Sequence, residues 1–146
     1  TRLEKHYLAV VHGKWPRRKQ HVDAPLVKNT LKSGERVSSV SAEGKSALTK
    51  ISVLEQSADY SLLAMQPVTG RTHQLRVHCQ HTGYPIVGDE KYGYEDQDAQ
   101  LKRLGVRRLM LHASRLVIPA DEPGEKTIRV EAPVDNSFKK MTEMIK

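Results

Sequence analysis

Short runs of β-prone apolar residues, each ended by a glycine or a polar turn, dominate the first half of the chain. Tyr7 to Val11 is one such run, closed by Gly13. Lys45 to Leu54 and Tyr60 to Met65 are separated by a short polar spacer, which predicts an antiparallel hairpin. Arg36 to Ser41 follows a Ser-Gly turn and predicts another strand. The first half is therefore expected to form a sheet.

Helical spacing of apolar residues begins after Gly70. We expect a helix from about His73 toward Thr82, with Thr72 or Thr69 as its N-cap and Gly83 at its end. Its predicted inner face consists of Leu75, His78, Cys79 and Thr82. Downstream we expect two more helices, Gln97 to Leu104 and Asn136 to Ile145, and two more strands, within Leu109 to Ile118 and over Thr127 to Val130.

The order of these elements indicates the fold class. Several short strands come before most of the helices, without regular strand–helix alternation, and Pro25 disfavours a central strand over Val22 to Lys28. A length of 146 residues suits a single unit with its own core. The sequence therefore predicts one α+β domain.

Charge adds a class of partner to this picture. The formal net charge is +7, which attracts polyanions. Basic residues crowd around Trp15, and a second basic group lies near Gly105; the members are Lys14, Arg17, Arg18 and Lys19 in the first and Lys102, Arg103, Arg107 and Arg108 in the second. Such clusters suit RNA phosphates, and a solvated loop is the equally simple alternative for either one.

Composition also argues against several classes of protein. No apolar run approaches the roughly 20 residues needed to span a bilayer. The first residues lack the pattern of a secretory signal, so we expect the cytoplasm. Cys79 is the single cysteine, which excludes an internal disulfide.

The segment from Gly70 to His78 has the highest density of chemically active side chains. Two arginines, two histidines and an amide fall within nine positions at a predicted helix start, where an anion would be stabilised. Arg71 precedes the helix and is placed to grip a carboxylate or a phosphate. A structural salt bridge is the alternative role for Arg71.

Other chemistries have weaker support. His73 and His78 are five positions apart and do not share a helix face, so His73, His78, His81 and Cys79 do not predict a zinc site. Cys79 falls on the inner face and is expected to be a buried, inert thiol. With no such zinc site, we expect no metal. No glycine-rich phosphate loop is present, so we expect no nucleotide cofactor either.

Gly70 to His78 resembles the arginine motif of the RluA-type pseudouridine synthases, which modify ribosomal and some transfer RNA. Three further segments resemble family motifs in the right order: Lys5 to Gly13 the tyrosine strand, Gly83 to Gly93 the following loop, and Leu109 to Ala113 the closing strand. The resemblance covers nearly the whole chain. It implies a mixed, mainly antiparallel sheet flanked by helices and crossed by a basic cleft.

The resemblance also implies roles for individual residues. Tyr7 would stack on the target uracil, and Arg71 would pair with the catalytic aspartate of the family. The substrate-binding residues it implies are His73, Gln74, Leu75 and Arg76, with Leu75 as an apolar wall. The expected partner is large-subunit ribosomal RNA, bound by a monomeric enzyme that isomerises uridine to pseudouridine without a cofactor.

One element of the family pattern is missing. The aspartate of the family lies in a His-Arg-Leu-Asp phrase before the tyrosine strand, and no such phrase occurs here. Glu4 is too close to Tyr7 to replace it, and neither Asp23 nor Asp89 takes its place. We therefore expect residues 1–146 to be the carboxyl-terminal part of a catalytic domain, without the aspartate segment or the amino-terminal RNA-binding domain. We expect it to be inactive alone; a non-catalytic RNA-binding module is the competing hypothesis.

Overall fold

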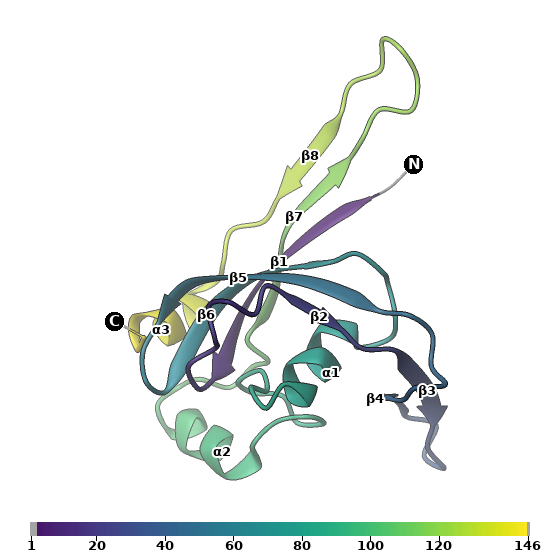
Figure 1. Ribbon diagram of the computed structural model, residues 1–146. Helices are drawn as coiled ribbons and strands as arrows, with labels where there is room; N and C mark the ends of the chain where they lie inside the picture. Colours follow the sequence, from purple (N-terminus) through teal and green to yellow (C-terminus); the bar gives the residue numbers. More distant parts are fainter. Residues whose placement is uncertain (1–2, 146) are drawn as a thin grey trace.

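A computed structural model describes residues 3–145 and shows a strongly bent antiparallel sheet with helices packed beside it (Figure 1). The six-stranded sheet has the order β2-β5-β6-β1-β7-β8, and β3 and β4 form a separate two-stranded sheet. Every strand pairing in the described part of the chain is antiparallel. The strands are β1 (Glu4–His12), β2 (His21–Asp23), β3 (Leu26–Thr30), β4 (Arg36–Val40), β5 (Leu48–Gln56), β6 (Tyr60–Pro67), β7 (Leu111–Ile118) and β8 (Ile128–Glu131).

Strand β1 lies inside the sheet because its apolar run is buried by neighbours on both sides. It pairs with β6 from Tyr7↔Met65 to His12↔Tyr60 and with β7 on its other edge. Ala9, Val10 and Val11 are fully buried. The predicted hairpin is confirmed as β5 and β6, although β5 begins only at Leu48, because Lys45 forms a bridge to Leu26 instead.

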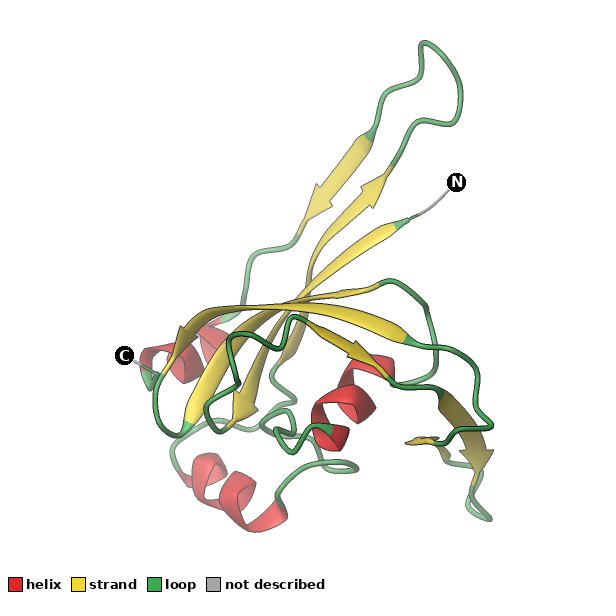
Figure 2. Ribbon diagram, in the orientation of Figure 1, coloured by secondary structure: helices red, strands yellow, loops and turns green. Residues whose placement is uncertain are grey.

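The three helices confirm the α+β prediction. They are α1 (Gln74–His81), α2 (Glu95–Arg103) and α3 (Asn136–Glu143). Figure 2 shows α1 and α2 on the same side of the sheet, with α3 at one end. Asp135 caps α3 by accepting a hydrogen bond from the backbone N–H of Phe138 at 2.8 Å, and Phe138 and Met141 bury the apolar face. None of the helices within residues 3–145 has the length and apolar character needed to cross a membrane.

The predicted threonine cap of α1 is wrong. The N-cap is His73, in the left-handed conformation at φ 53° and ψ 26°, and no side chain caps the first turn. The hydroxyl group of Thr69 instead accepts from the N–H of Leu48 and donates to Oε1 of Gln74, which ties it to the start of β5. Long-range contacts therefore decide how this helix begins.

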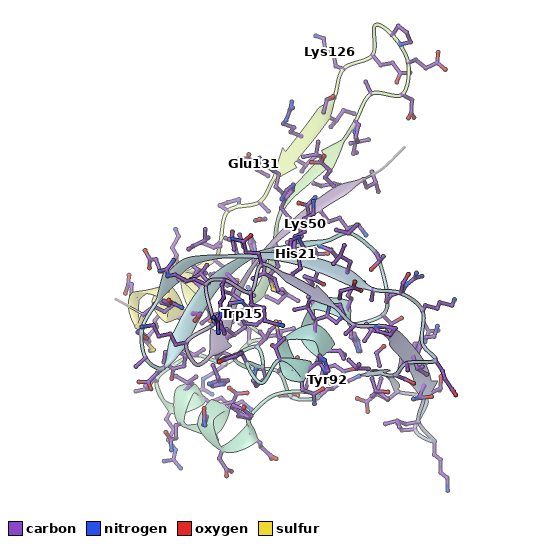
Figure 3. The ribbon with its side chains drawn as sticks, viewed as in Figure 1. Trp15, His21, Lys50, Tyr92, Lys126 and Glu131 are labelled. Atoms are coloured by element: carbon purple, nitrogen blue, oxygen red, sulfur yellow. The ribbon has the colours of Figure 1, made fainter. Side chains whose placement is uncertain are left out.

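Strand β8 forms one edge of the sheet and is exposed along its whole length. Its hairpin with β7 projects from the body of the molecule, with Lys126 near the tip (Figure 3). Ile128 and Val130 are about half exposed, at 53% and 52%. Exposed apolar side chains on an open strand edge make this hairpin a surface on which another strand could pair.

Candidate active site

A cavity of about 520 Å³ lies where the first half of β1 meets the end of β6 and the start of α1. Its walls bring together the predicted residues Tyr7, Arg71, His73, Gln74, Leu75 and Arg76. Lys5 adds another cation, and none of the described lining residues is an aspartate or a glutamate. Residues from β1 and from the start of α1 thus line one cationic pocket.

Tyr7 enters this cavity from an irregular point in the sheet. The register between β1 and β7 shifts between His6 and Tyr7, so that His6 pairs with Arg115 and Tyr7 with Ala113. Ser114 is the extra residue, and its hydroxyl group donates to the backbone oxygen of His6 at 3.0 Å. A β-bulge bends a strand and redirects a side chain, which explains how a central strand presents a tyrosine to a cavity.

Arg71 is anchored in the turn before α1. Its Nε donates to the backbone oxygen of Ser46 at 2.8 Å, and its backbone N–H donates to Oε1 of Gln74 at 3.1 Å. Within residues 3–145, no carboxylate forms an ion pair with Arg71, so its alternative role as a structural salt bridge is not observed. The terminal nitrogens of this guanidinium are therefore available to an incoming anion.

Gln74 and Leu75 hold the start of α1 against the sheet. The amide of Gln74 is 4% exposed and uses all its hydrogen-bonding groups within the protein. It donates to the backbone oxygen of Leu48 and to Oγ1 of Thr49, and it accepts from Arg71 and Thr69. Leu75 is nearly buried and belongs to the main core. We expect Gln74 to shape the pocket through these bonds.

Arg76, rather than Arg71, forms the structural salt bridge of this segment. Its Nε and one terminal nitrogen donate to the two carboxylate oxygens of Asp89, at 2.9 and 2.8 Å. The Asp89 side chain is fully buried and also accepts from the backbone N–H groups of Lys91 and Tyr92. Burial raises the pKa of Asp89, but the hydrogen bonds from Arg76 and Tyr92 and the charge of Arg76 outweigh it, so that the pKa is lowered.

Tyr92 connects this salt bridge to His73. Its ring lies under Arg76, with the guanidinium carbon 5.2 Å from the ring centre. Its hydroxyl group lies 2.9 Å from Nδ1 of His73. Burial, and then the charges of Arg76 and Lys91, lower the pKa of His73 and favour the neutral imidazole. Sequence reasoning assigned neither Asp89 nor Tyr92 to the site; their presence together in the motif-like loop Gly83 to Gly93 was the available signal.

His78 and Cys79 of α1 are structural. His78 is fully buried, with its two ring nitrogens bonded to Oγ1 of Thr49 and to the backbone oxygen of Ala24. Cys79 is fully buried, and burial raises the pKa of its thiol, which confirms the prediction of an inert side chain. Among the residues that the structure describes, no group of three or more histidine, cysteine or acidic side chains is arranged to hold a metal ion.

The predicted RNA-binding loop lies away from the cavity. It follows β1 at the end opposite Tyr7, since Gly13 already bonds to Asp59 in the turn between β5 and β6. His12 lies five residue steps along the strand from Tyr7, which is roughly 16 Å. Figure 3 shows Trp15 at this end and Tyr92 near α1. The four cations are all exposed: Lys14, Arg17, Arg18 and Lys19. These predicted RNA-binding residues are therefore not among those that line the cavity.

Comparison with known proteins gives a consistent result. Residues 1–81 match the family described as RNA pseudouridylate synthase. Similar curated proteins include ribosomal large subunit pseudouridine synthase C of Yersinia pestis, 46% identical over 94% of this chain and 42% of that protein. The same enzyme of Escherichia coli (strain K12) is 44% identical over 99% of this chain and 46% of its own length. The chain thus spans less than half the length of these relatives.

Solved structures show the same fold. Human RNA pseudouridylate synthase domain containing 1 is 28% identical with a TM-score of 0.70, over 99% of this chain and 66% of that one. Human RNA pseudouridylate synthase domain containing 4 is 25% identical with a TM-score of 0.71, over 98% of this chain and 62% of that one. Together with the cavity that gathers the motif residues, these matches show that the chain belongs to the RNA pseudouridylate synthase family.

Proposed function

We propose that this protein isomerises uridine to pseudouridine in RNA, with large-subunit ribosomal RNA as its substrate. One observation carries the proposal: the cavity at the start of α1 gathers Tyr7, Arg71 and Leu75, which resemble the functional residues of the family, beside several cations. The names of the curated relatives support the choice of ribosomal RNA. We expect a monomeric protein that acts in the cytoplasm.

The reaction suits the composition of this cavity. It breaks the bond from N1 of uracil to the ribose, turns the freed base and joins C5 to the ribose, while N1 gains a proton and C5 loses one. Reactant and product are isomers, so no electrons are transferred to another molecule. The target uridine leaves its stack to reach the cavity, where the ring of Tyr7 lies against the base and Leu75 supplies an apolar wall.

A carboxylate completes this chemistry in our proposal. None of the described lining residues supplies one, and Asp89, in the loop after α1, is committed to Arg76. We propose that it comes from a His-Arg-Leu-Asp segment outside these 146 residues and pairs with Arg71. The bond from Arg71 to Ser46 anchors the side chain, which leaves its terminal nitrogens for a bidentate contact.

The test is release of tritium from ribosomal RNA labelled at C5 of uridine, with the full-length protein. Pseudouridine formation removes this hydrogen, so release measures the reaction. We expect Arg71→Ala to lower kcat by about 100-fold or more, the range found when a group that stabilises reacting charge is removed. Arg129→Ala on the exposed strand β8 is the matched control and should react like the unmodified protein. Binding of RNA without any tritium release would overturn the proposal.

A non-catalytic RNA-binding module is the second candidate. The observation that favours it is the absence of an acidic residue from the described lining of a cationic cavity. The 146-residue chain and the full-length protein distinguish the two. Salt-dependent RNA binding by both, without isomerisation by either, would support the binding module.

A further inference from the structure

A second hollow adjoins the candidate active site. It measures about 460 Å³ and lies between the β3–β4 hairpin, the turn at Gly44 and Lys45, and the residues just before α1. Gly70 and Arg71 line both this hollow and the candidate active site. A chain that occupies the first cavity can therefore continue over Arg71 into the second.

The second hollow carries excess positive charge. Lys28, Lys45 and Arg71 line it, against the single carboxylate of Glu43. In the part of the chain that the structure describes, none of these three cations forms an ion pair, whereas nearby Lys91 pairs with Glu35 at 2.7 Å. Cations that line a hollow without a carboxylate to neutralise them make a favourable site for an anion.

The walls of this hollow are held together before any ligand binds. Leu26 and Lys45 exchange two backbone hydrogen bonds of 2.9 Å, which join the turn to β3. A Cβ atom on Gly44 would lie 2.5 Å from the backbone of Leu26, so this close approach depends on glycine. Arg71 bonds to Ser46, and Ser38 Oγ donates to the backbone oxygen of Thr72 at 2.8 Å. The backbone that carries the cations is thus preorganised.

We propose that this hollow binds the phosphodiester linkage next to the target uridine, through Lys28 and Lys45. The inference rests on the proposed function, because a uridine in the first cavity remains joined to its neighbours in the RNA chain. The linkage that leaves the cavity past Arg71 meets two further cations. A positively charged groove of this kind follows the backbone of single-stranded RNA and supplies affinity without reading the bases.

The test measures binding of the full-length protein to a short single-stranded RNA with one central uridine. In a set of analogues, each linkage in turn is replaced by a neutral methylphosphonate. We expect neutralisation of one linkage beside the uridine to weaken binding to the unmodified protein, and to have a much smaller effect on Lys28→Ala/Lys45→Ala. The slope of log affinity against log salt should also become shallower by about 0.7 in this variant, the value for one phosphate of a single strand.

Lys139→Ala/Lys140→Ala is the charge-matched control. Both lysines are exposed on α3, and Figure 1 places α3 and β3 at opposite ends of the molecule. This variant should keep the response of the unmodified protein to each methylphosphonate. The inference would be overturned if each methylphosphonate weakened RNA binding by the same factor in the Lys28→Ala/Lys45→Ala variant as in the unmodified protein. This test measures binding and not catalysis. If one linkage beside the uridine matters less in the lysine variant but no tritium is released in the activity assay, only the proposed isomerase activity is refuted.

Discussion

The hydroxyl group of Tyr92 lies 2.9 Å from Nδ1 of His73 and accepts a hydrogen bond from the backbone N–H of Ser38 at 3.0 Å. One phenol therefore joins three segments: the loop before α2, the left-handed residue that begins α1, and strand β4. The geometry suits a hydroxyl that donates to the neutral imidazole. It explains how a non-glycine residue is held at positive φ beside the candidate active site.

Replacement of Tyr92 by phenylalanine should destabilise the fold. The change keeps the ring but leaves the backbone N–H of buried Ser38 without its partner, which costs about 1–3 kcal/mol. Tyr94→Phe is the matched control, because its hydroxyl group makes an exposed 3.2 Å bond to Gly83 and its loss should cost about 0.5 kcal/mol or less. Urea unfolding measures both variants. Equal stabilities would contradict a structural role for the Tyr92 hydroxyl.

Asp89→Asn should have a large effect on stability. The substitution removes the buried negative charge that pairs with Arg76, and breaking a buried pair from one side costs about 3 kcal/mol. The neighbouring Glu90 offers a matched control: it lies 3.7 Å from Lys102, both side chains are exposed, and Glu90→Gln should be almost neutral. A free energy of unfolding for Asp89→Asn within measurement error of the Glu90→Gln value would refute this account of the pair.

The histidine of the candidate site should titrate below its ordinary range. Burial, followed by Arg76 and Lys91, lowers the pKa of His73, so the folded protein resists the proton that the unfolded chain binds below about pH 6.5. This contribution to stability is therefore present above pH 6.5 and is lost as the pH falls below it. Proton NMR of the imidazole measures the titration directly. A midpoint at or above 6.5 would show that the surroundings of His73 do not favour the neutral form.

Alanine substitutions at two glycines with positive φ should distinguish the cost of backbone strain from the cost of a steric clash. Gly34 has φ +86° with no atom near its missing Cβ, whereas Gly88 has φ +81° and a Cβ there would lie 2.2 Å from the backbone oxygen of Arg108. Gly34→Ala should cost about 1–2 kcal/mol through the left-handed conformation alone. Gly88→Ala should cost clearly more, because it adds a clash beside the loop that carries Asp89. Thermal unfolding of both variants checks this order; similar melting temperatures would contradict it.

The amino-acid sequence by itself determined much of the fold. Alternating apolar residues and polar turns placed β1, β5 and β6, and helical spacing placed α1, because these signals are local. The crowding of Arg71, His73 and Arg76 at a helix start was equally local, so the candidate site was recognised. The family motifs then placed Tyr7 in the same cavity, which the bulge in β1 and β7 makes possible.

Only the tertiary structure decided which groups meet across long separations. Arg76 rather than Arg71 forms the salt bridge, His73 rather than a threonine begins α1, and the loop near Trp15 lies at the far end of β1. The hollow beside Arg71 was equally hidden, since Lys28 comes from strand β3 and Lys45 from the turn before β5. Strand register and loop packing set these contacts, and both depend on burial of the whole core rather than on the preferences of neighbouring residues.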